Sequence, residues 1–116
     1  MIETINDEFP WAEHMNCAVT VCDANGTILY MNERSRATFA SHGDLIGKNL
    51  FECHSQASID KIRHMLATGE SNCYTISKNG QHKMIYQTPW RQNGTIAGMV
   101  EISMVIPDEM PHYVRG

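Results

Sequence analysis

Short runs of β-prone residues alternate with turn residues along much of this 116-residue chain. The dipeptide Asn-Gly occurs three times, at 25–26, 79–80 and 93–94, and each copy stands between two such runs. Asn and Gly tolerate the positive φ angles of a type I′ turn, so each copy predicts a two-residue hairpin. The pattern predicts five strands, at 18–23, 27–32, 71–77, 82–91 and 95–106. They would form one hairpin and a later three-stranded meander.

Alternation within the strands predicts which side chains share a face. In the last strand the more apolar set, expected to face the core, is Ile96, Gly98, Val100, Ile102 and Met104. Met99 falls on the opposite, outer face. In the strand before it, the side chains that share one face are those of Met84, Tyr86, Thr88 and Trp90.

About forty residues without strand character separate the second and third strands. A short helix is predicted over 32–40, two short turns broken at Gly47 over 43–54, and a longer helix over 55–69. The longer helix carries an apolar stripe of Ile59, Ile62, Met65 and Leu66, and Gly69 is placed to end it. A further short helix is predicted near the N-terminus, with Pro10 in its first turn. The element order predicts an α+β domain, with helices on one face of an antiparallel sheet.

Composition narrows the class of protein. The net charge is −4, and Lys and Arg are scattered, which argues against binding to nucleic acid or to an anionic membrane. No segment approaches the ~20 apolar residues of a membrane-spanning helix, and the first residues are acidic rather than signal-like. We therefore expect a cytoplasmic, soluble protein with reduced cysteines. The four cysteines lack a Cys-x-x-Cys spacing, which argues against a metal site.

Three segments, in this order, resemble the PAS family of sensory domains: "VTVCDANGTILYMNERS", "DLIGKNLFE" and the closing "NGTIAGMVEIS". Asp23 before the first turn and Asn32 after the second strand match the opening hairpin of that family. The resemblance covers about residues 12–105. It divides the chain into a cap segment (1–15), a PAS-like domain (16–106) and a tail (107–116). The "CH" before a helix, together with the last hairpin, also resembles PAS domains found beside hemerythrin-like domains.

The resemblance implies a five-stranded antiparallel sheet with an N-terminal cap helix, and a sensory rather than an enzymatic role. Domains of this family commonly bind a small ligand between the helices and the inner sheet face, and signal through a homodimer or a partner protein. The residues expected to line such a pocket are Phe51, Cys53, His54, Ile62, Leu66, Met84, Tyr86, Trp90 and Val100. Those expected in the cap or the dimer contact are Phe9, Trp11, Met15 and Met99.

The adjacent pair Cys53-His54 leaves several interpretations open. PAS-type flavin photoreceptors carry their reactive Cys where Leu50 stands, so Cys53 is three residues late for a flavin adduct. A catalytic dyad is disfavoured because adjacent helical residues point about 100° apart. A haem-based redox or gas sensor with His54 as axial ligand is an alternative. So is a ligand-free dimerisation module in which the pair only packs.

Overall fold

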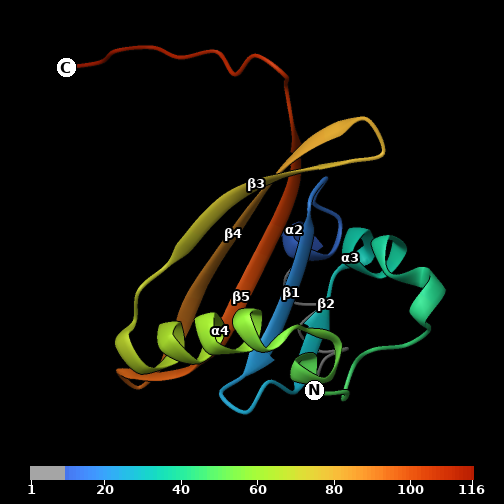
Figure 1. Cartoon of the computed structure of the whole chain (residues 1–116), viewed down its shortest axis with the longest axis vertical. Coiled ribbons are helices and arrows are strands. Elements are labelled where there is room, and N and C mark those ends of the chain that lie inside the picture. The colour runs from blue at the N-terminus through green and yellow to red at the C-terminus, as the bar shows by residue number, and fades with distance from the viewer. Residues whose placement is uncertain (1–9) are drawn as a thin grey trace.

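The computed structural model describes residues 10–116, with the side chain of Cys53 excepted (Figure 1). One antiparallel sheet has the order β2-β1-β5-β4-β3. Its strands are β1 (Ala18–Asp23), β2 (Ile28–Met31), β3 (Asn72–Lys78), β4 (Gln81–Gln92) and β5 (Thr95–Ile106). The helices are α2 (Pro10–Glu13), α3 (Glu33–Thr38) and α4 (Gln56–Thr68), with 3-10 turns η1 (Ala40–His42) and η2 (Leu50–Cys53). The predicted α+β sheet and its short helices are confirmed, and the expected cap residue Phe9 lies outside the described residues.

Two of the three Asn-Gly turns have the predicted geometry. Asn79 and Asn93 both have φ of 53°, and each is followed by a glycine with positive φ, so these hairpins close through two residues. The prediction for the first turn is wrong. There Asp23 Oδ1 accepts hydrogen bonds from the backbone N–H of Asn25 and of Thr27, both at 2.9 Å. This side-chain bonding favours a three-residue loop in which Gly26 takes the positive φ.

The helix α4 crosses the sheet obliquely on the face turned to the viewer in Figure 1. Ser55 caps its first turn, and Gly69 ends it in the left-handed conformation, as predicted. Its Ile62 and Met65 are about 1% exposed and pack with Cys22 and Met99 of the sheet. Leu50, Phe51 and Leu66 pack around this cluster.

The predicted assignment of sheet faces is wrong by one residue. Met99 packs beneath α4, so the inner face also carries the residues in its register, which include Thr20, Glu101 and Gln87. Met84, Tyr86, Trp90 and Val100 fall on the outer face by the same register. Counting apolar residues misled the prediction because the inner face of this sheet is the more polar one.

Residues 47–50 run along the edge of β2 that no other strand occupies. Gly47 N–H donates to Ile28 O at 2.7 Å, Ile28 N–H to Lys48 O at 2.9 Å, and Leu50 N–H to Gly26 O at 2.7 Å. These bonds hold η2 beside the sheet. Of the two turns predicted in 43–54, the second corresponds to η2, while the first helical turn lies earlier, at η1.

Asn32 joins three elements through one buried amide. Its side chain has no exposed surface. Its Oδ1 accepts from Val19 N at 2.9 Å and from Ser35 N at 3.0 Å, and its Nδ2 donates to Ala12 O at 2.8 Å and Cys17 O at 2.9 Å. All four bonding positions of the amide are therefore used.

We predict that Asn32→Ala lowers the free energy of unfolding by about 3 kcal/mol, because it strands four buried backbone groups. Urea denaturation at neutral pH measures this. Asn16→Ala is the matched control, since Asn16 is exposed and bonds only Arg34 in the described part of the chain. It should change the free energy by less than about 0.5 kcal/mol. An equal loss in both variants would contradict the assigned role of Asn32.

An ion pair fastens α2 to the sheet and to α3. Glu13 is buried and pairs with the Arg36 guanidinium, which also donates to Met31 O at 2.6 Å. The Tyr30 hydroxyl donates to Glu13 Oε1 at 2.8 Å. Tyr30 pairs with Val21 on the outer face, so α2 covers that side of β1 and β2. The Arg36 hydrogen bond holds the pKa of Glu13 below its ordinary value of 4.5, against the opposing effect of burial.

A carboxyl group whose pKa is lower in the folded state stabilises the fold above its unfolded pKa. This contribution disappears as the pH falls through the folded value. We predict that Glu13→Gln lowers the free energy of unfolding at pH 7 by about 1 kcal/mol, a modest loss because Arg36 is partly solvated. The variant should then lose less additional stability than the wild type between roughly pH 5 and pH 3.

Chemical denaturation at a series of pH values tests this pH dependence. Glu33→Gln is the control, because Glu33 is 68% exposed on α3, the helix of Arg36, and contacts only His14, at 3.7 Å, among the described ion pairs. It should retain the wild-type acid sensitivity. If Glu13→Gln also retains the wild-type acid sensitivity, then the Glu13–Arg36 pair does not determine how stability falls with pH.

Candidate functional site

A partly open cavity lies between the inner sheet face and the segment that joins α3 to α4. Its volume is about 310 Å³. The wall is mainly apolar and carries four polar side chains; its members are Thr20, Ile28, Met31, Phe39, His42, Leu45, Leu50, His54 and Glu101. A small, mostly apolar cavity with a few placed polar groups has the character of a ligand site.

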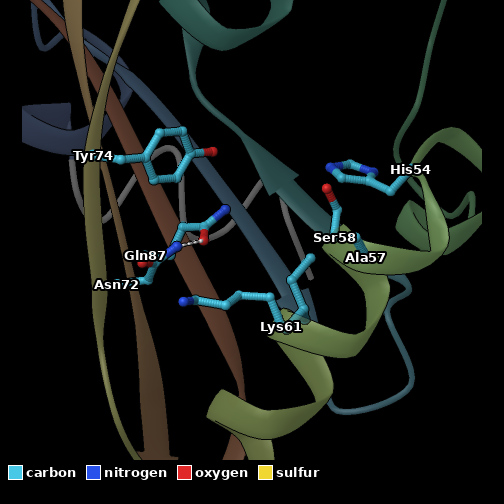
Figure 2. A pocket seen from close by; sticks show the side chains of 8 residues that line it. His54, Ala57, Ser58, Lys61, Asn72, Tyr74 and Gln87 are labelled. Carbon is cyan, nitrogen blue, oxygen red and sulfur yellow. Dashed lines mark hydrogen bonds between the residues drawn. The ribbon is translucent and has the colours of Figure 1, made fainter.

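A second, more open cleft of about 440 Å³ lies on the other side of His54. Figure 2 shows its two walls. His54, Ala57, Ser58 and Lys61 come from the start of α4, and they face Asn72, Tyr74 and Gln87 on the strands. Because His54 lines both spaces, its imidazole stands where the cavity and the cleft meet.

A row of polar side chains crosses the inner face between α4 and the cavity. Asn72 Nδ2 donates to Gln87 Oε1 at 3.1 Å, and Gln87 Nε2 donates to Glu101 Oε1 at 2.8 Å. These two bonds fix the orientation of the buried Gln87 amide and hold one oxygen of the Glu101 carboxylate. Within residues 10–116, no hydrogen bond is formed by the other oxygen of Glu101.

The backbone fixes the tautomer of His54. Its Nδ1 lies 2.8 Å from Leu50 O. A carbonyl oxygen only accepts, so Nδ1 carries the proton and Nε2 of the neutral ring keeps its lone pair. His54 therefore offers Nε2 as a hydrogen-bond acceptor or metal ligand.

Two contacts connect the cavity wall to α3. Thr20 Oγ1 lies 2.6 Å from Ser35 Oγ, and Arg36 donates to the carbonyl of Met31. Thr20 and Met31 line the cavity, whereas Ser35 and Arg36 belong to α3. A rearrangement of the cavity wall would therefore change the contacts of α3. The Arg36 side chain of α3 in turn pairs with Glu13 of α2.

The predicted pocket residues divide between several places. His54 lines the cavity and the cleft, and Ile62 lines the cleft. Phe51 and Leu66 pack against the α4 core cluster. The side chain of Cys53 lies outside the described residues.

Four other pocket candidates lie away from the cavity. Met84, Tyr86 and Val100 belong to the outer face, because that face is one residue out of phase with the prediction. Trp90 donates from Nε1 to Cys22 O at 3.0 Å, across Gly98. A Cβ on Gly98 would come within 2.7 Å of that indole nitrogen, so the glycine makes room for the bond.

The predicted cap and dimer residues also separate. Met99 is 3% exposed in the core and is unavailable to a partner, so that prediction is wrong. Trp11 is 65% exposed and Met15 is 39% exposed, at and just after α2.

Sequence reasoning missed Thr20, Gln87 and Glu101. Their common signal is a polar residue in the middle of a strand, at matching positions of three neighbouring strands. Such a row costs stability unless it is hydrogen-bonded or faces a cavity. That signal becomes readable only once the strand register is known.

The cavity tests the haem alternative by its size. An apolar cavity of about 150 Å³ holds one benzene ring, so 310 Å³ accommodates roughly two rings. A porphyrin contains four pyrrole rings and needs more space than this cavity alone provides, whereas the cleft of about 440 Å³ adjoins it at His54, whose tautomer would suit an axial ligand. In the described part of the chain, no three His, Cys, Asp or Glu side chains group as a metal site. No helix described there is long and apolar enough to cross a membrane.

Solved structures with the same fold are numerous, at low sequence identity. A C-terminal domain from Streptococcus mutans has a TM-score of 0.70 at 17% identity, covering 87% of this chain and 84% of that one. A structure described as VqmA bound to DPO has a TM-score of 0.67 at 20% identity, covering 88% of this chain and 57% of that one. The Aer2 receptor of Vibrio cholerae, described as a dual PAS-heme oxygen sensor, has a TM-score of 0.63 at 16% identity, covering 80% and 96%.

A comparison with curated proteins found no match. The family model described as PAS fold matches residues 12–109, which is most of the chain. The matched residues include the whole five-stranded sheet, which has the order β2-β1-β5-β4-β3. The chain belongs to the PAS family, whose members are sensory and signalling modules.

Proposed function

We propose that this PAS domain senses a compact small molecule held in the 310 Å³ cavity. The observation that carries the proposal is the cavity itself, a partly open and mainly apolar space lined by Glu101 and His54, each of which has an unused acceptor atom. A fold held together only by packing gains nothing from such a space. The proposed role is sensing rather than catalysis.

The proposed signal leaves the cavity through α3. A ligand that moves Thr20 or Met31 changes the contacts of Ser35 and Arg36, and Arg36 holds Glu13 of α2. Ligand binding would then shift the population between two positions of the cap helix. The exposed Trp11 on that helix offers the surface that a partner would read.

The structural neighbours support a sensory role in general terms. One is described with the small molecule DPO bound, and another as a heme oxygen sensor. For this chain we favour a small organic ligand over haem, because the cavity holds roughly two rings. The scattered positive charge favours a cytoplasmic protein partner over nucleic acid or a membrane.

The first test is native mass spectrometry of the protein as purified, with an absorption spectrum of the same sample. We expect an added mass of a small organic molecule on each chain, without a Soret band. Leu45→Trp, which fills the cavity, should abolish the added mass. Leu29→Trp is the control, since Leu29 lies outside the cavity lining, and it should retain the ligand. A Soret band lost in His54→Ala would instead support the haem alternative.

A second proposal concerns assembly, because family members commonly signal through dimers. The outer sheet face carries half-buried apolar side chains, and Tyr86 on it is 36% exposed. We predict that this face forms a homodimer and that Tyr86→Glu weakens the dimer at least tenfold, since it places a charge in an apolar contact. Sedimentation equilibrium measures the effect.

Tyr74→Glu is the matched control for the dimer measurement. Tyr74 is 42% exposed but lies on the inner face of β3. The same substitution there should leave the dimer unchanged. Equal weakening by both variants would place the contact elsewhere, and a monomeric wild type would favour signalling through a different partner.

A further inference from the structure

We propose that the cavity selects a one- or two-ring molecule that donates N–H hydrogen bonds and carries a positive charge, such as an aryl amidine or a protonated arylamine. The inference rests on the proposed function, that the cavity binds a small ligand. It adds the chemical class of that ligand, argued from which atoms of the wall are already engaged and which are not.

The Glu101 carboxylate has one oxygen that can still accept a hydrogen bond. An ionised carboxylate only accepts hydrogen bonds, so Gln87 turns its amide NH₂ toward Glu101 and leaves its Oε1 to accept from Asn72. Its Nε2 is therefore committed to Glu101 Oε1. The remaining carboxylate oxygen has no protein donor in the described part of the chain, so a ligand N–H would satisfy it.

His54 presents the same kind of atom from the opposite wall. Its proton is used by Leu50 O, which leaves Nε2 as an acceptor in the neutral ring. The hydroxyl of Thr20 is engaged with Ser35. Two acceptors on opposite walls of an apolar space fit a ligand with N–H groups on its edge.

The charges of the residues that line the cavity also favour a cationic ligand. Among the residues that line the cavity, Glu101 is the one carboxylate, and none is Lys or Arg. Lys78 and Lys83 line an adjoining cleft that Glu101 also reaches, but neither forms an ion pair with it within residues 10–116. A carboxylate in a mainly apolar wall without a paired cation favours a cationic ligand and disfavours an anionic one.

The test uses three molecules of nearly equal shape: benzamidine, a cation with N–H donors; benzamide, which is neutral; and benzoate, an anion with acceptors only. Each is titrated into the full chain, stripped of any retained ligand, and followed by amide NMR. We expect benzamidine to bind at least tenfold more tightly than benzoate. The shifted amides should include those of Thr20, Leu45 and His54.

Glu101→Gln then changes one atom of the site. The carbonyl of the new amide can still accept from Gln87, while its NH₂ group replaces the oxygen that no donor of the described chain bonds. The preference for benzamidine over benzoate should fall at least tenfold or reverse. Glu52→Gln is the matched control, because it removes the same charge from an exposed residue outside the cavity lining. It should leave the preference within about twofold, because solvent and salt screen an exposed charge.

The inference is overturned if benzoate binds the wild type as tightly as benzamidine, or if Glu101→Gln leaves the preference unchanged. It is also overturned if benzamidine shifts no amide of the cavity wall. None of these results removes the proposed sensing function, which is judged separately by the mass retained in the purified protein and its loss in Leu45→Trp.

Discussion

The buried amide of Asn32 is the contact on which the arrangement of the N-terminal half depends. It occupies the point where β2 ends and α3 begins, and it also bonds the backbone of α2, of β1 and of the link between them. Those backbone groups are buried together and have few other places to bond. Removing the amide would leave them without partners in a region that water does not reach. The cap helix, the opening hairpin and α3 therefore all bond to this one side chain, and the Glu13–Arg36 pair adds a second link between them.

The inner face of the sheet has two parts with different chemical character. The inner face covers a packed cluster under α4, but beyond that cluster it carries a polar row, Asn72–Gln87–Glu101. The row is tolerated because each member bonds the next, and because its end opens into a cavity. Stability is thus concentrated at α4 and at the Asn32 junction. The cavity wall lies between these two regions and carries His54 and Glu101, the residues to which we assign ligand recognition.

Much of the fold could be predicted from the sequence because the signals are local. Asn-Gly turns, the apolar stripe of α4 and Gly69 predicted elements that the structure reproduces within a residue or two. The candidate site could not be predicted in the same way. Whether Met99 or Val100 faces inward depends on what covers the sheet, and alternation alone does not supply that information. The three-residue first loop depends on the Asp23 side chain, which competes with the Asn-Gly preference. The sequence identified His54 as a candidate because it directly precedes a helix. Glu101 could be placed on the inner face only once the register of the strands was known.

The segment 47–50 has a consequence for how copies of this chain can meet. By bonding to β2 it closes one edge of the sheet, whereas β3 at the other end leaves its outer backbone groups unpaired by strands of the described chain. A sheet with two open edges can extend without limit, which is the geometry of fibrils. With one edge sealed, strand-to-strand addition ends after a single neighbour. The segment whose Leu50 lines the cavity therefore also occupies the start of this sheet edge and hinders the addition of a strand there.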